Sequence, residues 1–231
     1  MVRFTAAFAL ASALALANAA EYKLRFPTPK SEKIVRVRNL TYLQPFSPPL
    51  VVAHTRDVAL FKEGTAASYA IKTMAEDGDN SALLALAATA DVAPYICGVA
   101  VSEGPLFPGE TWRATFDVDT NICGDSAVFS VVTMLINTND AFMGIDSQSL
   151  PDYGTTKSFP PAFDAGTETN DELCSHMPGP ACDADSGNEM AAPGEEFIQV
   201  HRGIHSVGDI SESSYDWRNL VAEMVMFGPS Y

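Results

Sequence analysis

The segment that most constrains the fold is an almost unbroken apolar run, SAVFSVVTMLI, from Ser126 to Ile136. A run of this length that is rich in β-branched residues predicts a central strand covered on both faces. The segment TWRATFDV, from Thr111 to Val118, alternates apolar and polar residues instead. This period of two predicts a strand with one buried face. Together the two segments indicate a sheet protein in which one strand lies between other layers.

The rest of the chain continues this pattern. Further strands are predicted in KIVRVRNL, PLVVAHTRDVALF, PYICGVAV, EEFIQVHRGIH and LVAEMVMF. Two helices are expected over Thr65–Asp79 and Asn80–Ala90, the first capped by Thr65, with Ala66, Tyr69, Ala70 and Met74 on its apolar face. Between Ser147 and Pro193 proline, glycine, serine, aspartate and asparagine predominate, which predicts long surface loops. We therefore predict an all-β antiparallel sandwich with short helical insertions.

The first twenty residues have the pattern of a secretory signal peptide. Arg3 precedes an apolar stretch that ends in Ala17-Asn18-Ala19, an A-x-A cleavage pattern. No later stretch offers about 18 uninterrupted apolar residues, so no transmembrane segment is expected. We expect a secreted, extracellular protein with a signal peptide over residues 1–20 and a single domain over residues 21–231.

The chain is strongly acidic. Its formal net charge is −15, and removal of Arg3 with the signal would leave 13 basic against 29 acidic residues, a net charge of −16. Nucleic acid and anionic lipid surfaces would be repelled by such a chain. Calcium, which is abundant outside cells, is a more suitable ligand for it.

Four cysteines indicate disulfides in an oxidising compartment. Four cysteines allow three pairings, and keeping each bridge local favours Cys97–Cys123 and Cys174–Cys182. The alternative, a zinc site, lacks a C-x2-C spacing. Asn39-Leu40-Thr41 is a sequon for N-glycosylation.

Two histidines are the candidates for a catalytic metal site. His201 and His205 are four residues apart in HRGIH, so a strand would direct both side chains to one face. With an acidic loop they would suit a secreted metal-dependent hydrolase. Hydrogen-bonded structural histidines are the simpler interpretation, and no recognised catalytic motif accompanies them. We therefore expect a protein that is not an enzyme.

The segment FDAGTETNDE concentrates four acidic residues around Gly166. A pair of carboxylates could serve a glycosidase. Calcium is the better match, because it takes six to eight oxygen ligands gathered by a tightly turning loop. Asp164 and Glu168 could close on one ion, whereas Asp171 and Glu172 are expected to face solvent.

Five stretches, taken in order, resemble the spondin domain, the amino-terminal module of F-spondin and of stand-alone secreted proteins. They are FSPPLVVAHTRDVALFKEGTAASYAIKTMAEDGD, TMLINTNDAFMGID, FDAGTETNDE, GEEFIQVHRGIH and YDWRNLVAEM. They run from about Phe46 to Met226, and it is their combination that is specific. The resemblance implies a β-sandwich similar to a C2 domain, and a role in extracellular matrix and cell adhesion with an extracellular protein or glycan partner.

The resemblance also implies a calcium ion at one end of the sandwich. Carried over from the family motifs, its ligands are Asp140, Asp164 and Glu168. Glu168 departs from the aspartate usual in the family, and its extra methylene leaves open whether it reaches the ion directly or through water. Asp140 follows the most buried predicted strand, and Asp164 lies in a loop that could return to the same edge.

Overall fold

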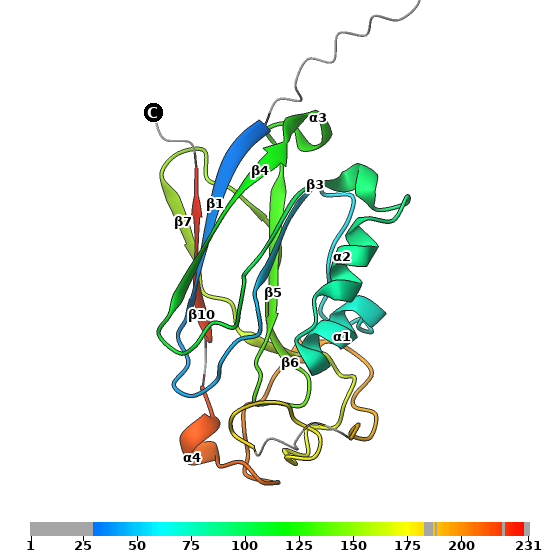
Figure 1. The fold of residues 1–231 in the computed structure, drawn as a ribbon, viewed down its shortest axis with the longest axis vertical. Coiled ribbons are helices and arrows are strands. Elements are labelled where there is room, and N and C mark those ends of the chain that lie inside the picture. Colours follow the sequence, from blue (N-terminus) through cyan, green and yellow to red (C-terminus); the bar gives the residue numbers. More distant parts are fainter. Residues whose placement is uncertain (1–29, 183–186, 188, 219, 229–231) are drawn as a thin grey trace, which may run out of the picture.

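The structure is a computed structural model that describes residues 30–182, 187, 189–218 and 220–228. The predicted signal peptide, residues 1–20, lies outside the described residues. Two antiparallel sheets pack face to face (Figure 1). One has the strand order β4-β1-β10-β7 and the other β3-β2-β5-β6-β8-β9. The predicted all-β sandwich is confirmed.

The elements follow one another along the chain with short helices between the strands. The strands are β1 (Lys30–Asn39), β2 (Leu50–His54), β3 (Ile96–Val101), β4 (Thr111–Asp119), β5 (Val128–Met134), β6 (Ala141–Ser149), β7 (Thr155–Ser158), β8 (Ala162–Asp164), β9 (Gln199–Val200) and β10 (Ala222–Phe227). The helices are α1 (Tyr69–Asp77), α2 (Ser81–Ala87), the 3-10 turn η1 (Ala93–Tyr95), α3 (Thr120–Cys123) and α4 (Glu212–Tyr215).

Strand β5 is the central strand that the apolar run predicts, and all seven of its residues are buried. Phe129 and Val131 face the other sheet in the main core. Val132 and Met134 face the opposite way, into a second cluster with α1. The strand is covered on both faces because a sheet packs on one side of it and a helix on the other.

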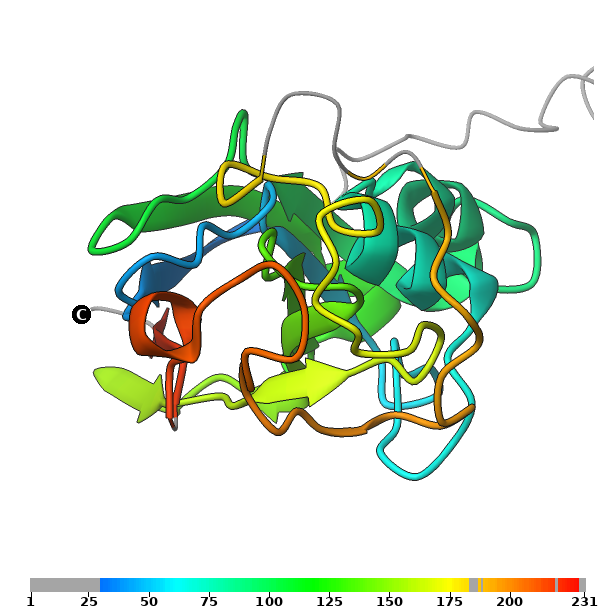
Figure 2. The same cartoon turned by 90° about the horizontal axis from the view of Figure 1, so that it is seen from below.

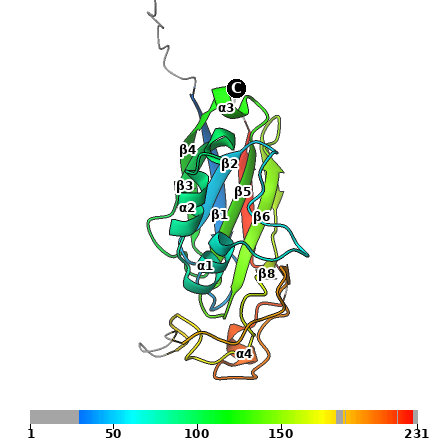
Figure 3. The same ribbon diagram turned by 90° about the vertical axis from the view of Figure 1, so that its right-hand side faces the viewer.

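Helices α1 and α2 cover the outer face of the six-stranded sheet (Figure 3). The first helix begins later than predicted, because Ser68, and not Thr65, caps it by accepting a hydrogen bond from the Ile71 N–H. Tyr69 is 76% exposed, so the predicted apolar face is only partly right. Ala70 and Met74 are buried as expected.

Among the described residues no helix is long and apolar enough to cross a membrane.

The region predicted as loops, residues 147–193, contains two strands. β7 and β8 lie within it, and β6 extends to Ser149. β8 has only three residues, too few for a periodic pattern to be visible in the sequence. Conversely, the strand predicted through EEFIQVHRGIH is reduced to the two residues of β9.

Both predicted disulfides are present. Cys97–Cys123 ties β3 to α3, and Cys174–Cys182 closes a short loop. The second bridge packs on a small apolar cluster that contains Met177. The bridges therefore fasten opposite ends of the sandwich.

Asn39 and Thr41 of the predicted sequon are buried in the folded chain, whereas Leu40 is exposed. Asn39 has no exposed surface, and its Nδ2 donates to the carbonyl oxygens of Gln44 and Leu106, at 2.8 and 3.0 Å. Its Oδ1 accepts from the Thr41 N–H and hydroxyl. Through these bonds Asn39 joins the loops that contain Gln44 and Leu106. Its amide nitrogen is therefore not accessible for glycosylation in the folded protein.

Candidate metal centre

The pairing of β6 with β8 brings the two predicted aspartates to one edge of the sheet. Ala141, the first residue of β6, lies opposite Asp164, the last residue of β8. Asp140 therefore stands directly before β6 and next to the end of β8, and its carbonyl oxygen accepts from the Ala165 N–H. Viewed from this end, the segments after β8 loop across the sandwich (Figure 2).

The Asp140 carboxylate is completely buried, and its two oxygens have different surroundings. Oδ2 accepts three hydrogen bonds, from the Thr167 N–H at 2.7 Å, the Thr167 hydroxyl at 3.1 Å and the Glu168 N–H at 3.1 Å. Oδ1 has no hydrogen-bond partner. A buried polar atom without a partner is rare and costly, so Oδ1 is suited to an additional ligand.

The Asp164 carboxylate is held by the turn that follows β8. Oδ1 accepts from the Gly166 N–H and Oδ2 from Asn170 Nδ2, both at 2.7 Å. Gly166 has φ +68°, and a Cβ there would meet the Phe197 carbonyl oxygen at 2.4 Å. Both the positive φ and the close approach require glycine, which agrees with the tight turn predicted for this motif.

The two aspartates repel each other in their charged forms. Burial, with the neighbouring Asp164 charge adding to it, raises the pKa of Asp140 to about 7 despite the hydrogen bonds to Oδ2. Burial likewise raises the pKa of Asp164, opposed by the bonds from Gly166 and Asn170. Two buried carboxylates side by side keep both charges at neutral pH only if a cation offsets them.

Glu168 approaches this pair through its backbone. Its N–H donates to Asp140, but its own carboxylate accepts from the Ala191 N–H at 3.2 Å. Burial, with the charge of Glu76 on α1 adding to it, raises the pKa of Glu168 to about 7. Among the described residues no three His, Cys, Asp or Glu side chains are grouped as a metal site. The structure thus brings Asp140 and Asp164 together without gathering the Glu168 carboxylate into a three-carboxylate cluster with them.

Two side chains, His201 and Asn170, orient Asp164 through consecutive hydrogen bonds. His201 Nδ1 accepts from the Gly203 N–H at 2.9 Å, so the ring proton is on Nε2, which donates to Asn170 Oδ1 at 3.0 Å. This bond fixes the Asn170 amide with its NH2 toward Asp164. The His201 ring also lies beside Trp217 in a tilted arrangement, with ring centres 5.1 Å apart. Asn170 was not identified from sequence, because nothing in the chain pattern distinguishes it from a loop asparagine.

The structure separates the two histidines of HRGIH. His201 is buried, and burial lowers its pKa to about 4, with the charge of His205 adding to the effect. His205 is exposed. Because β9 ends at Val200, the strand geometry that would have placed both side chains on one face is absent. Both nitrogens of His201 are already in hydrogen bonds.

The remaining acidic residues of the motif differ from their predicted roles. Glu172 is only 3% exposed, and its carboxylate accepts from the backbone N–H groups of His205 and Val207. Asp171 is half-buried and accepts from Asn139 and His176. The prediction that both face solvent is wrong. Glu172 is buried by its bonds to backbone N–H groups, and Asp171 is half-buried by its bonds to two side chains.

The residues present fit a hard divalent cation. Asp140 Oδ1 is unpaired, Asp164 lies beside it, and both are oxygen donors of the type that calcium prefers. Backbone carbonyl oxygens and water supply the further ligands in such sites. Asp140 and Asp164 would hold the ion, and Thr167 and Asn170 would orient them.

Fold and site together define a class: a disulfide-bonded β-sandwich with a buried pair of carboxylates at the end of one sheet. The family model described as Spondin_N matches residues 20–175, well over half of the sequence. The chain belongs to the spondin N-terminal domain family. The match includes Asp140, Asp164 and Glu168, whereas His201 lies beyond it. No curated protein matches the sequence.

Proposed function

We propose that this protein is a secreted spondin-domain protein that binds a structural calcium ion between Asp140 and Asp164. The observation that carries the proposal is the buried Asp140 Oδ1, which has no hydrogen-bond partner and lies beside a second buried carboxylate. A bound divalent ion would supply the positive charge that this pair lacks. Its role is structural, since it would fasten the β8–β9 connection to the start of β6.

We further propose that the domain works by binding and not by catalysis, as an adhesion module of the extracellular matrix or cell surface. Membership of the spondin family and two disulfides support an extracellular role. The partner would be an extracellular protein or a glycan. The acidic charge favours partners with basic groups, or contacts that a cation bridges.

Thermal unfolding in calcium and in chelator tests the ion. Calcium at about 100 times its Kd should stabilise the fold by about 2.7 kcal/mol. Asp164→Asn should abolish this gain, because it removes one of the two charges. Asp125→Asn is the matched control, since Asp125 is exposed in the turn after α3 and should leave the calcium response unchanged.

An unchanged melting temperature in calcium, or equal responses of the Asp164→Asn and wild-type proteins, would remove the calcium site. The binding role has a separate readout. Cells or matrix proteins should attach to surfaces coated with the calcium-loaded protein more than to surfaces coated with Asp164→Asn. Attachment that equals an uncoated surface contradicts the adhesive role alone.

A further inference from the structure

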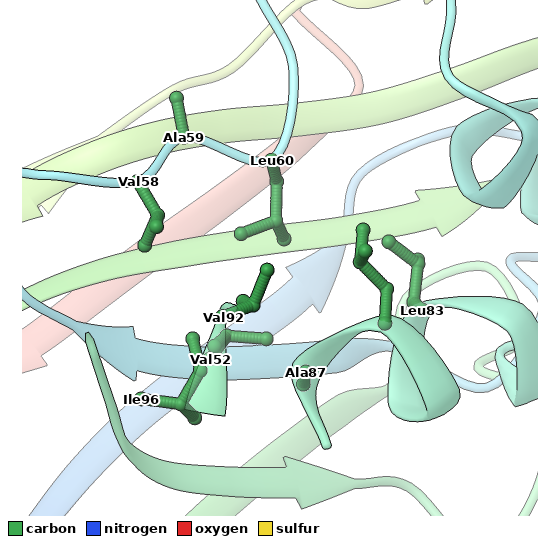
Figure 4. A pocket seen from close by; sticks show the side chains of 9 residues that line it. Val52, Val58, Ala59, Leu60, Leu83, Ala87, Val92 and Ile96 are labelled. Carbon is green, nitrogen blue, oxygen red and sulfur yellow. The ribbon is translucent and has the colours of Figure 1, made fainter. Parts of the chain in front are cut away.

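A hollow lies on the outer face of the six-stranded sheet, between helix α2 and the segment that follows β2 (Figure 4). Its volume is about 170 Å³. All nine residues that line it are aliphatic. Val52 of β2 and Ile96 of β3 form its floor, Leu83 and Ala87 of α2 one wall, and Leu60 the opposite wall.

The hollow exists because α2 presents a small residue where a large one would fill the space. Leu83 is 5% exposed and packs on the sheet, but one turn later the helix carries Ala87. Leu86, 42% exposed, lies at the rim. Protein interiors normally close such gaps, because a void forfeits contacts and destabilises the fold in proportion to its volume.

Water is a poor occupant of this hollow. No polar side chain lines it, and two of the backbone donors of its lining residues are already hydrogen-bonded. The Leu60 N–H donates to Asp146 Oδ1 at 2.7 Å, and the Val92 N–H to the Thr89 carbonyl oxygen at 3.2 Å. A bound water needs two to four polar partners, so the aliphatic lining of this hollow, which opens to solvent on one side, holds water weakly and favours apolar molecules.

The rim selects against anions. Asp57 and Asp91, both exposed, adjoin the lining residues Val58 and Val92. Arg56, which precedes Asp57, keeps its positive charge while it donates through Nη2 to Ser149 Oγ at 2.6 Å, but the two aspartates outnumber it. A carboxylate or sulfate head at the mouth would therefore meet negative charge on a chain that is already strongly acidic.

We infer that the pocket between α2 and the β2–α1 segment is a binding site for a small neutral apolar molecule, such as a single aromatic ring or a short branched hydrocarbon. The volume sets the size, because an engineered apolar cavity of about 150 Å³ in another protein binds benzene. The aliphatic lining favours an apolar ligand, and the acidic rim favours one without negative charge. The site is separate from the carboxylate pair and does not depend on calcium.

Benzene is the test probe, added to the full chain in calcium. It should raise the melting temperature by about 2–4 °C at roughly five times its Kd, as expected for a chain of this size. In methyl-resolved NMR spectra it should shift the signals of Val52, Leu60 and Leu83. Benzoate, which has the same ring with a charge, should produce neither effect.

Ala87→Leu fills the pocket while keeping a good helix former, so the stabilisation by benzene should disappear. Ala85→Leu is the matched control, because Ala85 is exposed on the same helix and does not line the pocket. If leucine is too wide, Ala87→Met occupies the same space with a more adaptable chain. Asp164→Asn should bind benzene as the wild type does.

Three results would overturn the inference. The first is a wild-type protein that benzene neither stabilises nor shifts up to its solubility limit. The second is stabilisation that survives in both Ala87 variants. The third is stabilisation by benzoate equal to that by benzene, which would contradict the neutral class of ligand.

Discussion

The two oxygens of the Asp140 carboxylate have unequal surroundings, and this inequality determines what the side chain can do. Three donors from Thr167 and Glu168 hold Oδ2, whereas Oδ1 has none. Rotating the carboxylate to pair Oδ1 would break the bonds to Oδ2, so the group is fixed in place. The proposed cation would meet a ligand that is already oriented, which would lower the entropy lost on binding.

Asn170 should act as a positioning residue for Asp164. Asn170→Ala removes the amide that donates to Asp164 Oδ2 and accepts from His201. Calcium affinity should fall by about tenfold, the lower end of the range for groups that orient metal ligands. Isothermal titration calorimetry measures it, with Asn121→Ala, an exposed amide of α3, as control. Equal affinities of Asn170→Ala and wild type would contradict the role.

The residues of this site could be predicted only where they belonged to a sequence motif. Asp164 was predicted from the acidic loop as well as from the resemblance, and Asp140 from the resemblance, and the structure places them side by side. The burial of Glu172 could not be foreseen, because its bonds are to backbone groups more than thirty residues away. The role of His201 could not be predicted either, because it depends on the hydrogen bond to Asn170 and on the residue at which β9 ends.

At the scale of elements, long periodic segments were predictable and short ones were not. β4 and β5 follow directly from alternation and continuous burial. β8 and β9 have three and two residues, and they form because neighbouring strands supply their hydrogen bonds. Their existence is a tertiary effect, so no local pattern marks them.

The turn after β8 gives an element-scale prediction. Gly166→Ala should destabilise the fold by about 1–3 kcal/mol more than Gly154→Ala, because overpacking costs that much in a closed site. Both glycines have φ near +70°, but a Cβ at Gly154 would meet nothing within 4 Å. The backbone strain is thus common to both variants, and the difference isolates the contact with Phe197. Urea unfolding measures it, and equal losses would contradict the close approach.

At the scale of the whole molecule, buried carboxylates accept the backbone hydrogen bonds of loops that have little helix or strand. Asp140, Glu168 and Glu172 each accept from backbone N–H groups of the segments that surround them. Asp209, which is exposed, likewise accepts from the Cys174 N–H. These acceptors organise a long connection that has almost no strand or helix. The cost is negative charge buried at one end of the sandwich, which is where a cation becomes useful.

The pH dependence of stability without calcium should expose this cost. The pKa of Asp140 is about 7 in the fold and 3.8 ordinarily, so the folded protein retains a proton that the unfolded chain releases. The resulting stability is present below about pH 4 and is lost as pH rises to about 7.

The Asp140→Asn variant has no ionisable group at this position. In chelator it should therefore match the wild type near pH 4 and exceed it at pH 8, by up to about 4 kcal/mol. The pH effects of Glu168 and His201 are shared by both proteins and largely cancel in this difference, whereas the repulsion between Asp140 and Asp164 is part of it. In saturating calcium the order should reverse, because the ion favours the ionised carboxylate that asparagine lacks. Urea unfolding across pH 4–8 measures both conditions, and parallel profiles for the two proteins in chelator would refute the account.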